Sequence, residues 1–290
     1  MKRYPVLAVM LVLMMSRTAA LLAPARSGSA AAARLPADTP TATWLSGESD
    51  AEITASAAAT RQVQGDFYYV ATNGDDDNPG TEEQPFRTIS KGARVVQAGD
   101  TLYVRAGTYH EQVIVSTSGT EPNPITLSAY PGEQPIVDGQ NSLPPGSWNC
   151  LLCISGEYVV VDGVGVSNST GYGVKVSGSN NRIQSMNVHH NYLAGILVTG
   201  DNNLIESSTV WSNCRSNENG LQYPEGLPAA LIAARSPSNT TIRNNTVYNN
   251  WGEGISTLEA QYTTIEDNVV YDNYSANIYI DNSSYVLVQR

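Results

Sequence analysis

The sequence predicts an all-β solenoid, a parallel β-helix, with a short helix capping its N-terminal end. One motif recurs from residue 158 to the C-terminus at intervals of mostly about 22 residues, and such self-similarity indicates stacked equivalent units. Each copy has a β-branched residue, a valine five positions later, and an asparagine or serine three positions after that. The valines of the five copies are Val166, Val188, Val210, Val247 and Val270.

The composition of each copy favours strands over helices. The apolar runs are short and alternate in polarity, as in Val174-Lys175-Val176, and Gly, Asn, Asp and Ser separate them. Helices would need apolar residues at i, i+3 and i+4 over about a dozen positions. Three short strands describe one rung, which must stack on its neighbours to bury its apolar face. The recurring Asn is expected to donate to the next rung, accept from the previous one, and adopt the left-handed conformation of a tight turn.

The chain before residue 66 reads as an export leader and a linker. Residues 1–20 fit a signal peptide, with cleavage as late as residue 30, because Lys2 and Arg3 precede an apolar stretch too short to span a membrane. Residues 21–64 are mainly Ala, Ser, Thr and Pro, which predicts a disordered linker. The expected protein is therefore secreted and extracellular, with no membrane span.

The globular region is expected over residues 66–290, with a cap at residues 66–99. A helix is predicted from Pro85 to Ala98, with Phe86, Ile89, Ala93 and Val96 on one face. This helix would cover the open end of the first rung, which begins near residue 100. A further rung starts near Val286 and stops at Arg290, so we expect the natural protein to continue beyond the present C-terminus.

Three stretches carry a family resemblance. They are YYVATNGDDDNPGTEEQPFRTISKGARVVQAGDTLYVRAGTYHEQVIV from Tyr68, PITLSAYPGEQPIVDG from Pro124, and YVVVDGVGVSNS from Tyr158. They resemble the N-terminal cap and first rungs of secreted right-handed β-helix proteins, including the family with a cap of unknown function and the pectate-lyase-like superfamily. The right hand also agrees with the crossover rule for parallel strands. The resemblance implies a substrate groove along the strands that begin with Gly-Ile pairs. Alternation on these strands predicts that Lys175, Leu197, Ser256 and Tyr279 point outward, and Glu253 is expected in the turn just before its strand.

Charge and cysteine content exclude some functions. The net charge of −11 becomes −16 once the five basic residues before position 35 are removed, and a nucleic-acid binder needs a basic surface instead. An acidic polysaccharide would need a bridging cation such as Ca²⁺. Asp75, Asp76 and Asp77 are weak candidates for its ligands, and a plain turn without a cation is the favoured interpretation of this acidic run. Cys150 and Cys153 are either a local disulfide or two buried small residues; Cys214 is expected to be free.

The longest step between repeats, from Val210 to Val247, indicates an inserted loop over residues 214–228. Insertions in solenoids map to loops on one face, often the binding face. A lyase there would use Lys175 or Arg235 as base, with Glu253 and Asp281 as cation ligands; a glycosidase would instead use Glu253 and Asp281 as its two carboxyls. The candidate substrate-binding residues are Trp251, Tyr279, Tyr223 and Glu225.

The sequence leaves open whether the protein is an enzyme. The leading interpretation is an extracellular carbohydrate-active protein that acts on or binds a polysaccharide, with a polysaccharide lyase as one form. The alternatives are a non-catalytic surface or adhesive module and a glycoside hydrolase using paired carboxylates.

Overall fold

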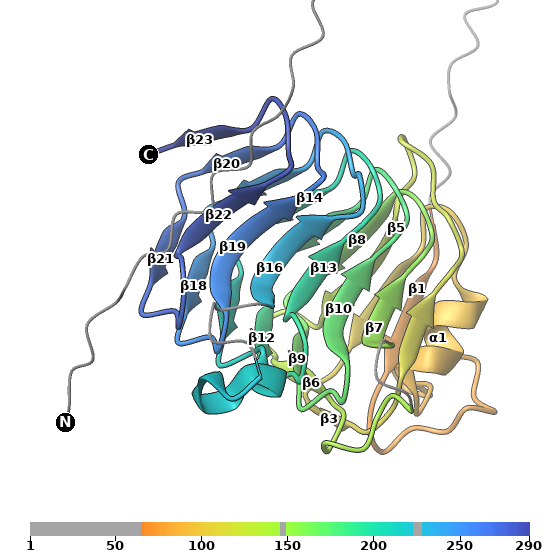
Figure 1. Ribbon diagram of the computed structural model, residues 1–290. Helices are drawn as coiled ribbons and strands as arrows, with labels where there is room; N and C mark the ends of the chain where they lie inside the picture. The colour runs from red at the N-terminus through yellow and green to blue at the C-terminus, as the bar shows by residue number, and fades with distance from the viewer. Residues whose placement is uncertain (1–64, 146–148, 223–227) are drawn as a thin grey trace, which may run out of the picture. The chain divides into compact units, whose positions relative to one another are not determined.

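The computed structural model describes residues 65–145, 149–222 and 228–290, and these form a right-handed parallel β-helix (Figure 1). Each turn of the chain contributes one strand to each of three parallel sheets, called A, B and C here in the order in which the chain visits them. The predicted signal peptide and linker, residues 1–20 and 21–64, lie outside the described residues and stay predictions. No helix in the described part of the chain is long and apolar enough to cross a membrane.

The three sheets consist of strands of three to six residues, as follows. Sheet A contains β1 (Phe67–Val70), β2 (Thr101–Val104), β5 (Ile125–Ala129), β8 (Val159–Asp162), β11 (Arg182–Gln184), β14 (Leu204–Glu206), β17 (Thr241–Arg243), β20 (Thr264–Glu266) and β23 (Leu287–Gln289). Sheet B contains β3 (Gly107–Tyr109), β6 (Pro135–Asp138), β9 (Gly165–Ser167), β12 (Asn187–His189), β15 (Thr209–Trp211), β18 (Thr246–Tyr248) and β21 (Val269–Tyr271). Sheet C contains β4 (Val113–Val115), β7 (Cys150–Ile154), β10 (Tyr172–Val176), β13 (Ile196–Val198), β16 (Ala229–Ala234), β19 (Glu253–Leu258) and β22 (Ile278–Asp281).

The strand register is the one that the repeat predicts. In sheet A, Ile183 pairs with Val161 and Ile205, and in sheet B, Val188 pairs with Val166 and Val210. These side chains are fully buried and form the inner core. β-branched residues pack well on a pleated surface, and the period of two keeps each column on the inside.

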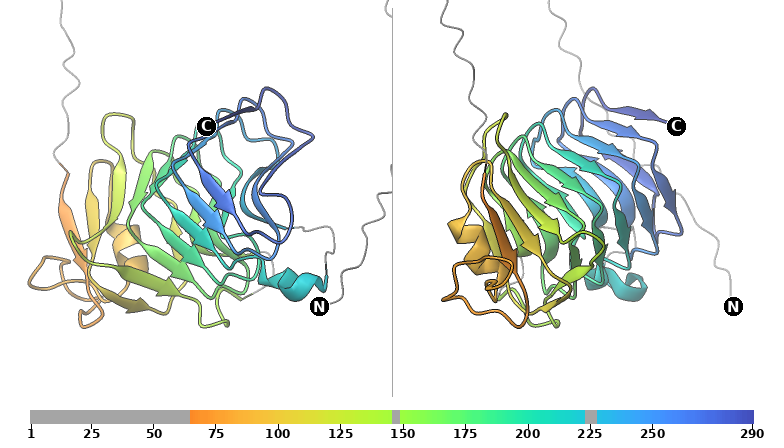
Figure 2. Two further views of the ribbon diagram at one scale, coloured as in Figure 1. Left: turned by 90° about the vertical axis from the view of Figure 1, so that its left-hand side faces the viewer. Right: turned by 180° about the vertical axis from the view of Figure 1, so that it is seen from behind.

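The N-terminal cap is confirmed, but its helix is shorter than predicted. Helix α1 spans Ile89–Val95 rather than residues 85–98 and closes the N-terminal end of the stack (Figure 2). Phe86 forms a parallel bridge with Val70 instead of a helical turn, so the chain before Thr88 is extended. Thr88 caps the helix by accepting a hydrogen bond from the Lys91 N–H. The four predicted apolar residues are nevertheless all buried in the core.

The asparagine ladder lies at the turn between sheets B and C. Its members are Asn191, Asn213, Asn250 and Asn273, with Ser169 at its start. The Asn213 Oδ1 atom accepts from the Asn191 N–H at 3.2 Å and from its Nδ2 at 2.9 Å. The Asn213 Nδ2 atom donates to the Val188 carbonyl at 3.0 Å. Each amide thus accepts from and donates to the preceding rung. Its Nδ2 also donates to the next rung, as predicted, but through the side-chain Oδ1 of the next asparagine rather than through a backbone carbonyl.

The left-handed residue of this turn is also not the one predicted. The residue before each ladder asparagine has the positive φ: 57° at His190, 51° at Ser212 and 53° at Asn249. The ladder asparagine itself is turned inward and buried. The glycine of the following Gly-Ile pair leaves room for it, because a Cβ at Gly195 would lie 2.8 Å from the Asn213 Nδ2.

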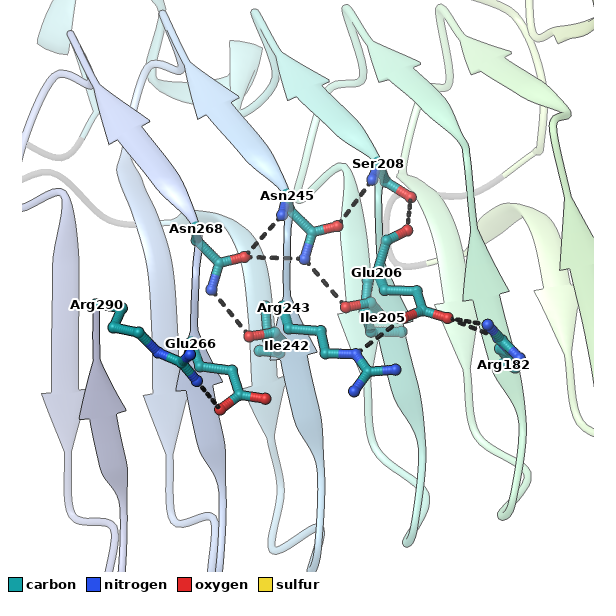
Figure 3. A network of polar contacts seen from close by, with 10 residues as sticks. All are labelled: Arg182, Ile205, Glu206, Ser208, Ile242, Arg243, Asn245, Glu266, Asn268 and Arg290. Atoms are coloured by element: carbon teal, nitrogen blue, oxygen red, sulfur yellow. Dashed lines mark hydrogen bonds and ion pairs between the residues drawn. The ribbon is translucent and has the colours of Figure 1, made fainter.

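A second ladder, which the sequence analysis missed, lies at the turn between sheets A and B (Figure 3). The Asn245 Oδ1 accepts from the Ser208 N–H at 3.0 Å, and the Asn268 Oδ1 accepts from the Asn245 N–H at 2.9 Å. Beside it, Glu206 is buried and accepts hydrogen bonds from Arg182 and Arg243. Burial opposes ionisation of Glu206, but these two bonds outweigh it and lower its pKa.

We expect Asn213→Ala to lower the free energy of unfolding by about 3 kcal/mol, because it leaves a buried N–H and a buried carbonyl of neighbouring rungs without partners. Chemical denaturation followed by circular dichroism measures the change. Asn187→Ala is the control, because this exposed side chain makes a single surface bond to Trp211 and its loss should cost about 0.5 kcal/mol. Equal losses in the two variants would contradict a structural role for the ladder.

Candidate functional site

The outer face of sheet C is shaped by a break in strand alternation. Cys150 and Cys153 both lie in an outer cluster, while Leu151 and Leu152 between them both belong to the inner core. The first and fourth residues of β7 therefore face outward, and the register extends this pattern to β10, β16 and β19. Glu253 is the first residue of β19 and pairs with Ala229, which lines an outer cavity. The structure thus places Glu253 in the strand and on its outer face, not in the preceding turn as predicted.

The residues in register with Lys175 form the outward column that alternation predicted, with Ile232 as an additional member. Lys175, Leu197, Ile232, Ser256 and Tyr279 are register neighbours across β10, β13, β16, β19 and β22. Adjacent strands lie ~4.8 Å apart, so Lys175 and Tyr279 are separated by roughly 19 Å. Polar residues thus lie towards the two ends of this column, whereas its middle is apolar.

An apolar cavity of about 250 Å³ occupies the middle of this face. Side chains from three neighbouring strands and from the inserted loop surround it. They are Tyr172, Leu193, Ala194, Leu197, Ser216, Pro228, Ala229, Ile232, Ala234 and Arg235. Arg235 is the single charged residue among them. Burial raises the pKa of the Tyr172 hydroxyl, and the positive charge of Arg235 partly opposes this effect. The structure therefore brings the predicted Arg235 to an apolar site, which Lys175 does not line.

Lys175 lies beside the paired cysteines. It is in register with Cys153 on one side and Leu197 on the other. Cys150 and Cys153 form a disulfide, which settles the alternative left open by the sequence, and Cys214 is a free, buried thiol as expected. Burial, and after it the charge of Glu253, raises the pKa of Cys214. This thiol is therefore held in its neutral form.

Glu253 and Asp281 lie on the neighbouring strands β19 and β22 but are not register partners, because Asp281 pairs with Leu258, five residues along β19 from Glu253. Glu253 is only 4% exposed, and its Oε2 atom has no hydrogen-bond partner within the described part of the chain. Burial is the main cause that raises its pKa; Asp281 adds to the effect, and a hydrogen bond from Ser256 opposes it. Glu253 is thus a buried carboxyl that favours its protonated form, and the Asp281 carboxyl is offset along the next strand.

The inserted loop begins with a kinked 3-10 segment, η1 (Arg215–Gly220), drawn as the teal coil in Figure 1. A polar hollow of about 490 Å³ lies beside it, lined by Asn141, Ser169, Thr170, Tyr192, Arg215 and Glu218. Arg215 donates to the Asn141 Oδ1 at 3.0 Å and lies 3.8 Å from the Glu218 carboxylate. The insertion therefore contributes to two different hollows, because Ser216 lines the apolar cavity.

The predicted aromatic contacts are dispersed. Trp251 packs against the inner core and lines a separate hollow with Tyr274, whose ring centroid lies 6.2 Å from its own. Tyr279 is 43% exposed at the far end of sheet C. Tyr223 and Glu225 lie outside the described residues and stay predictions.

The acidic run in the cap forms a turn. The Asp76 carboxylate accepts from the N–H groups of Arg87 and Thr88 and from the Thr88 hydroxyl. Burial opposes its ionisation, but these bonds prevail and lower its pKa. Asp75 accepts from the Asp77 N–H at 3.1 Å. Within residues 65–145, 149–222 and 228–290, no three His, Cys, Asp or Glu side chains gather as a metal site.

Comparison with known proteins identifies the family. A family model described as Pel9A-like, right-handed β-helix region matches residues 68–284. The chain belongs to the Pel9A-like right-handed β-helix family. It is thus a pectate-lyase-like β-helix, as the three resembling stretches predicted.

Individual relatives of this Pel9A-like chain align with it over only part of their own length. The uncharacterised protein YwoF of Bacillus subtilis is 33% identical over 139 residues, which are 45% of this chain and 30% of YwoF. Pectate lyase L of Paenibacillus polymyxa is 29% identical over 163 residues, 55% of this chain and 36% of the lyase. The chain thus aligns with about a third of the length of these relatives. The crystal structure of pectate lyase Pel9A shares the fold, with a TM-score of 0.58 and 20% identity over 72% of this chain and 55% of that one.

Sequence reasoning missed the residues that shape the hollows of this Pel9A-like protein. In the sequence, nothing distinguishes Tyr172, Leu197 and Ile232 from ordinary strand residues. The one available signal was Leu197, an apolar residue at a position that alternation directs outward. Arg215 and Glu218 lie in the insertion that the repeat spacing had marked. Their common hollow depends on Asn141, which is remote in sequence, and no local pattern relates it to them.

We expect Glu253→Gln to become more stable relative to the wild type as the pH rises from about 4 to 8. The raised pKa means that the folded wild type binds the Glu253 proton more tightly than the unfolded chain. The resulting stability is complete below the unfolded pKa of about 4.3 and is lost as the pH rises through the folded value. Glutamine cannot ionise, so the variant avoids this loss.

Denaturant midpoints of both proteins at the two pH values measure this effect. The same substitution at the exposed Glu157 is the control and should leave the pH dependence unchanged. A Glu253→Gln difference from wild type that stays constant with pH would show that the carboxyl does not titrate as the structure indicates.

Proposed function

We propose that this chain is an exported carbohydrate-active protein that acts on or binds a polysaccharide across the outer face of sheet C and the adjoining inserted loop. One observation carries the proposal: the insertion at η1 contributes to two hollows, one polar and one apolar, in a Pel9A-like β-helix. Concave sites with mostly apolar walls and a few placed polar groups are typical of small-ligand sites.

The chemistry of the polar hollow suits a sugar unit. Arg215 offers donors, Glu218 acceptors, and Asn141 and Thr170 both kinds of group, as the hydroxyls of a sugar require. Tyr192 adds an aromatic ring that is 44% exposed, on which the apolar face of a sugar ring can pack with little loss of side-chain freedom. The relatives named pectate lyase support a polymeric substrate.

A second candidate function is glycoside hydrolysis. The observation that favours it is the buried Glu253 carboxyl on the outer face of sheet C, whose pKa is raised and whose neighbouring strand carries Asp281. A carboxyl whose environment favours its protonated form suits the general acid of such a reaction. In this reading, Glu253 holds the proton that is given to the leaving oxygen.

Incubation of the purified chain with uronate and neutral polysaccharides, with and without calcium, tests both functions. We expect binding to at least one polymer. An unsaturated product absorbing near ~235 nm would indicate a lyase, in which Lys175 or Arg235 takes the proton next to the carboxylate. New reducing ends without this absorbance would indicate the hydrolase, and binding without product a non-catalytic module. Failure to bind any polymer would contradict the proposal.

The role of Lys175 is tested by Lys175→Met against Lys91→Met. We expect the first variant to lose about tenfold in affinity or turnover, because a charge-assisted contact to the sugar chain disappears. Lys91 lies on the cap helix, where its Nζ is 5.7 Å from the Phe86 ring centroid, and it lines neither the apolar cavity nor the polar hollow. Equal activity of the two variants would remove Lys175 from the site.

A further inference from the structure

We propose that the cavity on sheet C binds an aromatic ring that carries a carboxyl group, either a free aromatic acid or an aromatic acyl ester on a polysaccharide. The ring would lie among Leu197, Ile232 and the alanines, and the carboxyl oxygens would face Arg235 and Ser216. The ester form deepens the proposed function and rests on it, whereas the free-acid form does not.

The size of the cavity sets the size of the ligand. A cavity of ~150 Å³ lined by Leu, Ile and Phe is large enough to bind benzene. The present cavity of about 250 Å³ therefore has room for a single ring and a short arm of a few further atoms. An acetyl or methyl group would leave most of this space empty and would forgo the packing contacts of the walls.

The polarity of the walls excludes a bare sugar ring. The lining consists of apolar side chains apart from Ser216, Arg235 and the Tyr172 hydroxyl. A sugar ring would bring several hydroxyls, and each hydroxyl that loses water without gaining a partner costs free energy. An aromatic ring has no such groups and fills an apolar site by burial alone.

Two polar groups identify the other end of the ligand as an oxygen acceptor. The Ser216 Oγ is buried and has no hydrogen-bond partner among the described residues, although buried hydroxyls are usually bonded. Arg235 is the cation of the lining, and its fork of N–H donors suits the two oxygens of a carboxylate. A carboxyl or ester carbonyl supplies acceptors for both residues, whereas an amine would be repelled by Arg235.

Isothermal titration with cinnamate, galacturonate and methyl cinnamate tests the site on the full chain. We expect cinnamate to bind and galacturonate, which has the same charge but a polar ring, not to bind in this cavity. Arg235→Met should weaken cinnamate binding about tenfold and reduce the preference for cinnamate over its methyl ester. Ser216→Ala should weaken it severalfold without a change in the folded spectrum. Absence of cinnamate binding at millimolar concentration would overturn the proposal.

A matched pair of substitutions tests the position of the ligand. Ile232→Glu places a negative charge inside the cavity and should abolish cinnamate binding. Ile114→Glu makes the same change on the outer face of β4, at a residue that pairs with Cys153 and is 51% exposed. Ile114 does not line the cavity, so this variant should keep its cinnamate affinity within about twofold. Equal effects of the two changes would place the ligand elsewhere.

A polysaccharide that carries aromatic esters, compared with the same polymer after alkaline removal of the esters, separates the two sources. Tighter binding of the esterified polymer, lost in Ile232→Glu, supports the ester. Binding of cinnamate without any preference between the polymers would assign the cavity to a free acid and reject the ester. Binding of de-esterified polymer without any binding of cinnamate would retain the proposed function and overturn this inference.

Discussion

The structure depends on the satisfaction of buried backbone groups at its turns by the side chains of neighbouring rungs. The ladder asparagine of one rung accepts from the N–H of the preceding rung and donates to a carbonyl there, so no rung can form its turns alone. An unpaired buried amide costs more than the bond itself contributes, which penalises any slip in register. The register that satisfies the ladder also aligns the buried valine and isoleucine columns on the inside of the stack.

This constraint also explains where variation is possible. The step between Asn213 and Asn250 is longer than the other steps of the ladder, yet the Asn213 N–H still donates to the Asn250 Oδ1 at 2.8 Å. The described residues of the insertion therefore leave the stack at the turn, and the ladder continues across them. They form η1 and provide Arg215, Ser216 and Glu218 for the two hollows. A rigid stack thus carries the candidate site on the segment that its own register does not determine.

Features determined by local pattern could be predicted from the sequence, and those that need two distant segments could not. The rung register, the outward column from Lys175 to Tyr279, and the location of the insertion follow from the period of the repeat. The predicted start of the helix was wrong because Phe86 pairs with Val70, and a pattern of neighbouring residues cannot show a contact between positions so far apart in sequence. Glu253 was assigned to a turn because the double inward step at each strand start breaks simple alternation. The apolar cavity is built from side chains of several rungs, so no single repeat indicates it.

The charges of the chain also bear on its ligand. Acidic groups outnumber basic ones, so a polyuronate is repelled at a distance and is attracted only within a Debye length of Lys175 or Arg235. Between Lys175 and Ser256, the outward column of sheet C is apolar, so contact there depends on the burial of apolar surface. A polymer whose carboxyls are masked, or whose sugars carry aromatic acyl groups, meets both conditions. The long-range repulsion of polyuronates and the apolar cavity thus favour the same class of ligand.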